Sequence, residues 1–388
     1  MTSHDPSSSG GRSILDFIQA LRGGAALLVV LYHGSRFISP YGTGLGDVLF
    51  GTGGHIGVDL FFIISGFIMT HTTRSNDGSL GYFLMFAIKR FTRIWPTYVV
   101  IVLLYIFIRR EGGRFFLETE NLKLFLYTIG FVNSGRGGPP DFGLPVLNVG
   151  WTLNYEMYFY LVFGLALLFG AARWWAFGAW MALSLLLLPL LHGNAPSLHP
   201  GQAYGFRIGY LNLITSPLIW LFVLGTVIGN LYHSPLRIAS SFLRNHLLFL
   251  AFTLVVWQYL SRFQADHGLL SWGWSLGFLV LVLSLASKDM VFSIPKPILH
   301  LGNISYSLYL IHPLVQEGLE EPLATLGLGA YTQGFSFLFL TTALSILLAS
   351  LSQRWLERDL SNWLRDTLLR SLLRTRFKGV ILPVKSEA

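Results

Sequence analysis

The sequence predicts an all-α integral membrane protein, because it is rich in apolar residues, poor in charges, and built from long apolar blocks. Apolar residues make up 53% of the 388 positions and charged residues 12%, whereas a soluble domain carries about 25% charged residues. A helix needs roughly 20 apolar residues to cross a bilayer, and such blocks recur from end to end. They are continuously apolar and longer than barrel strands, which favours helices.

We predict about ten membrane-spanning helices from these blocks. An eleventh apolar stretch, at about 122–133, is interpreted as a re-entrant or interfacial segment. Its apolar residues, Leu122 to Val132, would cover only roughly 17 Å of a hydrocarbon core about 30 Å thick. The predicted spans are residues 15–34, 56–72, 91–109, 150–171, 174–192, 214–232, 246–262, 270–287, 302–317 and 333–353.

Loop charge predicts the orientation. With the N-terminus inside and 122–133 not spanning, most basic loops and the basic tail fall in the cytoplasm, as the positive-inside rule requires. Three basic residues near the start of the segment from Arg109 to Gly150 count against this topology. If 122–133 spanned, every later loop would change sides. The residues predicted to be cytoplasmic are Arg74, Lys89, Arg90, Arg93, Arg173, Arg237, Arg244, Lys288, Lys296, Arg354, Arg358, Arg365, Arg370, Arg374, Arg376 and Lys378, and the acidic cluster Glu317, Glu320 and Glu321 is predicted outside.

The chain is divided into three parts: a disordered cytoplasmic N-terminus (1–13), a membrane domain (14–355) and a basic cytoplasmic tail (356–388). The first apolar block is too long for a signal-peptide core and shows no cleavage site, so we expect it to be retained. The net charge of +8 is interpreted as membrane topology and not as nucleic-acid binding. Loops rich in Gly and Pro are expected on the outer side at 40–54, 134–145 and 193–205.

Cysteine is absent. This excludes disulfides, iron–sulfur clusters, thiolate metal sites and an acyl-cysteine intermediate. No metal site and no permanently bound cofactor are expected.

Ionisable residues inside the apolar blocks are the first candidates for a functional site. Arg22 and His33 are eleven residues apart, which places them on one helix stripe about 16 Å apart along the axis. Asp59, in GVDLFFIISGF, and Glu156, in GWTLNYEMYFY, are expected near the outer side. Each has a structural explanation: an interfacial histidine, carboxylates at helix N-termini, or an arginine pairing with one of them. Together they favour chemistry or transport, because each burial is costly.

The basic residues Lys89, Arg90 and Arg93 lie in KRFTRIWPTY at the predicted cytoplasmic start of the third span. Arg90 and Arg93 share a helix face. Ordinary positive-inside anchoring explains them, and a phosphate clamp for a nucleotide-type donor is the functional alternative.

The segment GNISYSLYLIHP (302–313) gives a predicted span an unusually polar face through Ser305, Tyr306, Ser307, Tyr309 and His312. Helix packing is the default explanation for its serines. Tyr309, His312 and Trp151 are candidates for lining an acceptor site or a pore.

Several of these blocks resemble the acyltransferase-3 family of integral-membrane acyltransferases. LDFIQALRGGAALLVVLYH resembles the family's first helix, with its signature of an Arg, ten residues and a His, matched by Arg22 and His33. GVDLFFIISGF, RFTRIWPTY, WTLNYE and SYSLYLIHP resemble later blocks in the same order. The departures at Gly24 and Thr152 are small. The similarity covers nearly the whole chain and is greatest to the subgroup that acetylates exopolysaccharides.

The resemblance implies transfer of an acyl group, commonly acetyl, from cytoplasmic acyl-CoA to a hydroxyl of an extracytoplasmic or lipid-linked glycan. It also implies a bacterial cytoplasmic membrane, an essential histidine at His33 with Arg22 as its partner, and a CoA-phosphate pair at Arg90 and Arg93. Because a sugar hydroxyl is a poor nucleophile, we expect His33 to act as a general base. Asp59 or Glu156 would orient it. An acyl-histidine intermediate is the alternative, and Arg22, Trp151 or a tyrosine could stabilise the oxyanion.

Other classes of protein explain this pattern less well than an acyltransferase. A proton-coupled exporter of a glycan or acyl group would also place ionisable residues inside the membrane, but no inverted repeat with paired broken helices is visible. A protein that only passes the acyl group across the membrane remains open. A structural subunit of a synthesis complex would not explain the buried ionisable residues.

Overall fold

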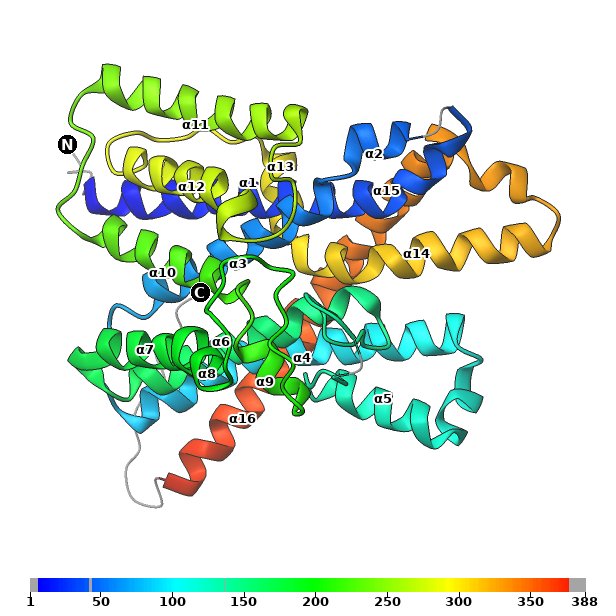
Figure 1. Cartoon of the computed structure of the whole chain (residues 1–388), viewed down its shortest axis with the longest axis horizontal. Coiled ribbons are helices and arrows are strands. Elements are labelled where there is room, and N and C mark those ends of the chain that lie inside the picture. Colours follow the sequence, from blue (N-terminus) through cyan, green and yellow to red (C-terminus); the bar gives the residue numbers. More distant parts are fainter. Residues whose placement is uncertain (1–5, 42–43, 136, 377–388) are drawn as a thin grey trace.

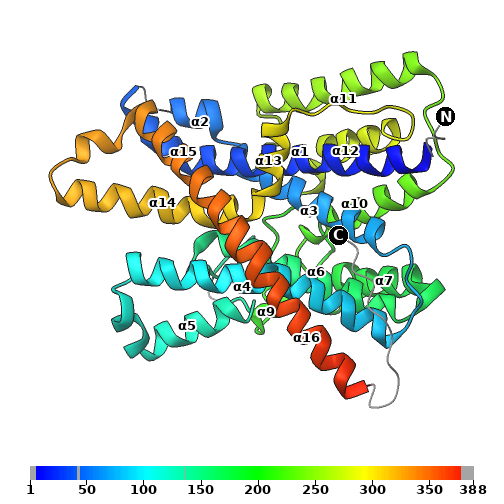
Figure 2. The same ribbon diagram turned by 180° about the vertical axis from the view of Figure 1, so that it is seen from behind.

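The structure, a computed structural model, describes residues 6–41, 44–135 and 137–376. Within these residues it is helical, and no strand is assigned there. Most of the long helices run roughly along the horizontal axis of Figure 1. Seen from behind, α16 crosses this bundle diagonally (Figure 2). The fold class predicted from the composition is therefore confirmed as all-helical.

Each predicted span coincides with helix, with shifted boundaries. The α-helices are α1 (Pro6–Gly34), α2 (Leu45–Phe50), α3 (Gly53–Thr72), α4 (Leu80–Arg109), α5 (Thr119–Ile129), α6 (Trp151–Leu167), α7 (Arg173–Ala182), α8 (Leu188–Leu191), α9 (Gly209–Ile214), α10 (Ile219–His233), α11 (Ser241–Ser261), α12 (Trp274–Ala286), α13 (Lys296–Asn303), α14 (Ser305–Thr325), α15 (Gly334–Ser352) and α16 (Ser361–Arg376). Short 3₁₀ or π segments are η1 (Ser35–Tyr41), η2 (Gly112–Leu117), η3 (Asn148–Gly150), η4 (Gly170–Ala172), η5 (Leu183–Leu187), η6 (Leu269–Gly273), η7 (Gly329–Thr332) and η8 (Gln353–Leu360).

Among the described residues, six helical segments are long and apolar enough to cross a membrane. This supports an integral membrane protein, while the predicted count of about ten spans is not confirmed. The other blocks are shorter or more polar, since α6 has 17 residues and α10 has 15. The six segments are Asp16–Ile38, Leu45–Thr72, Leu80–Arg109, Gly170–Leu191, Leu269–Ala286 and Gly334–Leu372.

The two ends of the chain differ from their predicted boundaries. Helix α1 begins at Pro6, inside the segment predicted to be disordered; residues 1–5 lie outside the described residues. The predicted tail 356–388 begins inside a helix, because α15, η8 and α16 follow one another without a break from Gly334 to Arg376. Charged residues end the apolar block near 353 without ending the helix. Residues 377–388 lie outside the described part.

Helix α4 begins at Leu80, eleven residues before the predicted span at 91. The apolar run LGYFLMFAI extends the helix toward its N-terminus, so Lys89, Arg90 and Arg93 lie well inside α4 and not at its start. This shift places the two arginines within the helical bundle.

Helices α3 and α10 cross closely at two glycines. A Cβ on Gly66 would collide with the carbonyl oxygen of Phe222, and one on Gly225 with that of Ile63. Small residues allow such backbone approach in membrane helices. The contact fixes the position of α3, which lines the central cavity described next.

Candidate active site

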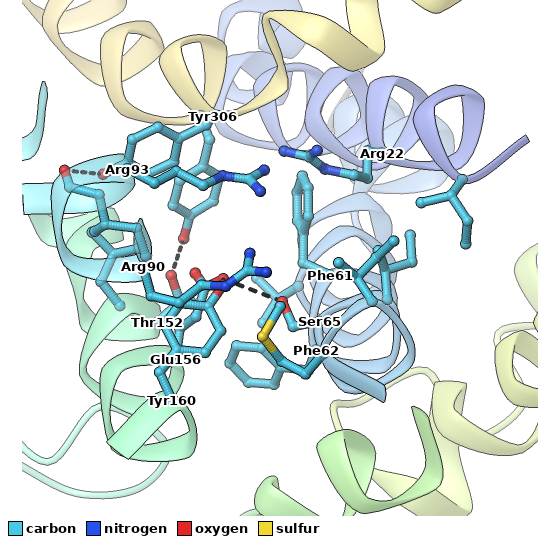
Figure 3. A pocket seen from close by; sticks show the side chains of 18 of the residues that line it. Arg22, Phe61, Phe62, Ser65, Arg90, Arg93, Thr152, Glu156, Tyr160 and Tyr306 are labelled. Atoms are coloured by element: carbon cyan, nitrogen blue, oxygen red, sulfur yellow. Dashed lines mark hydrogen bonds between the residues drawn. The ribbon is translucent and has the colours of Figure 1, made fainter. Parts of the chain in front are cut away.

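A central cavity of about 270 Å³ lies between α1, α3, α4, α6 and α14. Figure 3 shows polar side chains from these helices converging on it. The lining residues include ionisable and hydroxyl groups in a mainly apolar wall. They are Ile18, Gln19, Arg22, Val58, Phe61, Phe62, Ile64, Ser65, Ile68, Met69, Thr72, Arg90, Arg93, Ile94, Thr152, Leu153, Glu156, Tyr160, Tyr306 and Tyr309.

The cavity has an excess of positive charge. Three arginines and one carboxylate line it, which leaves two net positive charges (three minus one). The guanidinium groups of Arg22 and Arg93 point toward each other from opposite helices (Figure 3). Like charges in a weakly polar interior repel strongly, so this arrangement favours an anionic ligand.

Arg90 is held at the Thr72 end of the cavity. Its Nη2 donates to Thr72 Oγ1 at 3.2 Å, and its guanidinium carbon lies 5.6 Å from the Phe86 ring centroid and 5.7 Å from that of Tyr160. Arg90 Nε is buried and has no hydrogen-bond partner among the described residues. A planar guanidinium with a free donor is suited to phosphate or carboxylate oxygens.

Glu156 lies one and a half turns into α6 and faces α3. Its Oε1 accepts hydrogen bonds from Ser65 Oγ at 3.2 Å and from the Tyr160 hydroxyl. Its charge acts on Arg22. These contacts make Glu156 a counter-charge within the arginine cavity.

A second carboxylate, outside the cavity lining, is a further counter-charge for two of the arginines. Glu357, on η8, accepts hydrogen bonds from the Ser307 backbone N–H at 3.0 Å and from the Ser307 hydroxyl. Its charge acts on Arg22 and on Arg93. Helix η8 is π-helical, and π-helical turns occur frequently at functional sites.

His33 lies beside His312, away from the arginines. His312 is fully buried, and its Nε2 is 3.3 Å from His33 Nδ1. His312 Nδ1 is 3.2 Å from the Leu308 carbonyl oxygen, so it carries the proton and Nε2 accepts. His33 Nδ1 faces this acceptor and the Val29 carbonyl oxygen at 3.0 Å, which assigns its proton to Nδ1. The lone pair of His33 is therefore on Nε2.

Tyr309 lies between the cavity and this histidine pair. It lines the cavity, and its ring centroid is 6.1 Å from that of His312. Its hydroxyl lies 2.9 Å from Thr152 Oγ1 and donates to the Val149 carbonyl oxygen at 2.7 Å. Tyr309 thus contacts both parts of the candidate site.

Asp59 is fully buried but does not contact His33. Its Oδ1 is 2.7 Å from His267 Nδ1, and its Oδ2 accepts the Gly268 backbone N–H at 2.7 Å. The expected convergence of His33, Asp59 and Glu156 is therefore wrong. Asp59 faces the turn that precedes η6, and Glu156 faces the arginines deeper in the bundle.

The structure brings together five of the candidate residues in the cavity: Arg22, Arg90, Arg93, Glu156 and Tyr309. Lys89 is exposed and does not line it. Trp151 also lies outside the lining, with its ring 5.8 Å from that of His267. His312 pairs with His33.

Sequence reasoning missed Glu357, Ser65, Tyr160 and His267. Ser65 and Tyr160 lie in apolar blocks where hydroxyls are common, so they gave no distinct signal. Glu357 was assigned to the tail. His267 stands in a predicted loop, and nothing in the sequence connects it with Asp59.

These features define an integral membrane protein with an arginine-rich internal cavity and a neighbouring histidine pair. Residues 15–351 match the acyltransferase-3 family, described as an acyltransferase domain. The chain belongs to this family, and the protein is an integral-membrane acyltransferase. Glu357 lies just beyond the matched residues.

Similar proteins include bacterial proteins named for exopolysaccharide production, peptidoglycan O-acetylation and nodulation. The exopolysaccharide production protein ExoZ of Rhizobium meliloti is 29% identical over 310 residues, 79% of this chain and 90% of that protein. The peptidoglycan O-acetyltransferase OatA of Listeria monocytogenes is 27% identical over 89% of this chain, which spans 56% of the length of OatA. Nodulation protein 10 of Rhizobium leguminosarum bv. viciae is 25% identical over 83% of this chain and 91% of its own length. No solved structure matches.

Proposed function

We propose that the protein transfers an acyl group, most simply acetyl, from cytoplasmic acyl-CoA to a sugar hydroxyl of an extracytoplasmic or lipid-linked glycan, as in exopolysaccharide synthesis. The observation that carries this proposal is the cationic cavity, separated by Tyr309 from a histidine whose Nε2 is free to accept a proton. The names of the relatives ExoZ and OatA support a polysaccharide acceptor.

The donor fits the charge of the cavity. CoA carries phosphates, and three arginines face one glutamate among the lining residues. Pockets for drug-sized ligands span about 300–1,000 Å³, so a 270 Å³ cavity holds only part of the donor. The rest of the donor then extends beyond the Thr72 end, where Arg90 lies.

His33 is the proposed general base. The acceptor hydroxyl oxygen forms a bond to the thioester carbonyl carbon, while Nε2 of His33 takes the hydroxyl proton. The carbon–sulfur bond breaks, and the imidazolium returns the proton to the thiolate to give CoA-SH. His312 holds the proton on Nδ1 of His33, the orienting role expected of Asp59 or Glu156. An acyl-histidine formed on Nε2 is the alternative route.

The proposed setting is the bacterial cytoplasmic membrane with both termini in the cytoplasm. The donor then enters from the arginine side, where α1 and α4 begin, and the acceptor approaches from the side where α3 and α6 begin. The partners in this proposal are acyl-CoA, a glycan and membrane lipids.

The test compares surface glycans by mass spectrometry in cells with the wild type, a deletion and His33→Ala at matched expression. His246→Ala, an exposed histidine on α11, is the matched control. We expect an acyl mass to be lost in the deletion and in His33→Ala but kept in the control. Retention in His33→Ala would show that His33 is not the base, and an unchanged deletion would reject glycan acylation. Product formed by purified protein with acyl-CoA and acceptor alone would exclude a role limited to passing the acyl group across the membrane.

A further inference from the structure

A second group of histidines lies where α3 begins, outside the machinery described above. His267 Nδ1 is 2.7 Å from Asp59 Oδ1, and the other carboxylate oxygen accepts the Gly268 N–H at 2.7 Å. Asp59 is fully buried, and a carboxylate accepts but does not donate. Nδ1 of His267 therefore carries the proton, and its Nε2 takes no part in the contact with Asp59.

His55 is the second histidine of this group, and one of its ring nitrogens lacks a hydrogen-bond partner among the described residues. Its ring centroid is 4.4 Å from that of His267, at an interplanar angle of 81°. His55 Nδ1 is buried and has no hydrogen-bond partner among the described residues. A buried polar atom left unpaired is costly, so this nitrogen is suited to a partner from outside the chain.

The two histidines belong to a continuous row of rings that leads to the proposed base. Trp151 lies 5.8 Å from His267, Tyr32 lies 6.1 Å from His55, and Tyr32 lies 5.0 Å from His33, between ring centroids. We call Trp151, His267, His55, Tyr32 and His33 the ring row. All five are half-buried, so each keeps some accessible surface.

The chemistry of the ring row differs from that of the cavity. None of its five members carries a permanent charge, whereas the cavity is lined by three arginines. Aromatic rings present a negative face, which suits the C–H bonds of a sugar ring. The imidazoles can pair with hydroxyls as donors or acceptors. A neutral carbohydrate therefore matches the ring row, as an anionic donor matches the cavity.

We propose that the ring row is the acceptor subsite, which binds a sugar ring beside His33 with one of its hydroxyls bonded to Nε2 of His267. Asp59 is then a positioning residue for His267. This proposal rests on the proposed function, which supplies the reaction at His33. A purely structural role is the competing explanation, because Asp59 also ties the turn at Gly268 to α3.

The test uses the purified full chain in lipid nanodiscs with acetyl-CoA as donor. The acceptor probe is the oligosaccharide mixture released from deacylated exopolysaccharide of the deletion strain. We expect His267→Ala to raise the KM for the oligosaccharide at least about tenfold, the typical cost of a lost hydrogen bond to a buried polar group. The KM for acetyl-CoA should stay within twofold, and His246→Ala should match the wild type.

A second variant separates binding from folding. Trp151→Leu removes a ring of the row without touching the bonds of Asp59, so it should also raise the oligosaccharide KM alone. An unchanged oligosaccharide KM in both variants would overturn the proposal. A parallel rise in both KM values with a lower melting temperature would also overturn it, since this pattern is expected if the residues only stabilise the fold.

Direct binding distinguishes this proposal from the proposed function. If the wild type shows no turnover with acetyl-CoA, the proposed function fails. Calorimetric titration with the same oligosaccharides then still tests whether the ring row binds the acceptor. Binding by the wild type that is lost in His267→Ala and Trp151→Leu supports the ring row. Absence of binding by the wild type, or equal binding by all three proteins, overturns it.

Discussion

Nε2 of His312 lies 3.3 Å from Nδ1 of His33, and His312 is fully buried. The contact joins α14 to α1 and fixes which nitrogen of His33 carries the proton. We predict that His312→Leu lowers kcat about tenfold, a part of the 10²–10⁴-fold typical of general-base assistance. The KM for acetyl-CoA should be unchanged, because His312 does not line the cavity.

The conservative variant His312→Gln provides the control for this prediction. A glutamine carbonyl oxygen can accept from His33 Nδ1, so most of the activity should return. Steady-state kinetics of both variants distinguish a hydrogen-bonding role of His312 from a packing role. Equal loss in the two would indicate that His312 only fills space in the bundle.

Arg93 is predicted to bind the donor through its planar guanidinium. We expect Arg93→Lys to raise the KM for acetyl-CoA about tenfold, because lysine cannot make the bidentate contact with phosphate. The kcat should change less. Arg237→Lys is the matched control, since Arg237 is 62% exposed in its ion pair with Asp289. A KM equal to that of the control would contradict phosphate binding by Arg93.

The sequence singled out the three arginines that line the cavity, but it did not predict how deep Arg90 and Arg93 lie in the bundle. Arg22 stood out because a charge inside an apolar block is costly to insert, whereas Arg90 and Arg93 stood out as a basic pair on one helix face at the start of a predicted span. All three line the cavity. The partner of His33 was not predictable, because helix rotation decides which side chains meet. Asp59 bonds to His267, 208 residues away, and His33 meets His312, 279 residues away. Sequence spacing carries no information at such separations.

The structure at the end of the membrane domain was also not predictable from the sequence. Charged residues from Arg354 onward end the apolar block, so a tail was predicted from residue 356. The helix continues through them to Arg376, and Glu357 lies on the face of this helix that is turned toward the arginines. Only the packing of α14 against this segment, through Ser307, reveals the contact.

Glu357→Gln tests whether the negative charge of Glu357 offsets the repulsion between Arg22 and Arg93. Glutamine can still accept from the Ser307 N–H, but the repulsion between Arg22 and Arg93 is no longer offset. We expect the empty protein to lose on the order of 2 kcal/mol of stability, since Glu357 is half-buried. CoA should restore more stability in the variant than in the wild type. Thermal unfolding with and without CoA measures both effects; equal melting curves would show that Glu357 does not act on the arginines.

The α3–α10 crossing should be sensitive to a single methyl group. Gly225→Ala places a Cβ against the Ile63 carbonyl oxygen, and overpacking typically costs about 1–3 kcal/mol. Gly24→Ala is the matched control, because no atom lies within 4 Å of the added Cβ. We expect a lower melting temperature and less protein in the membrane for Gly225→Ala only. Similar behaviour of the two variants would mean that this crossing tolerates a wider separation.

The orientation can be tested with single cysteines, because the sequence has none. Ala195 and Ala239 are both exposed and lie on either side of α10. If α10 spans and 122–133 does not, a membrane-impermeant maleimide should label Ala195→Cys in intact cells and Ala239→Cys only after lysis. The reverse pattern would show that 122–133 spans and that the later loops are inverted. Labelling of both from one side would show that α10, with 15 residues and roughly 22 Å of length, does not cross.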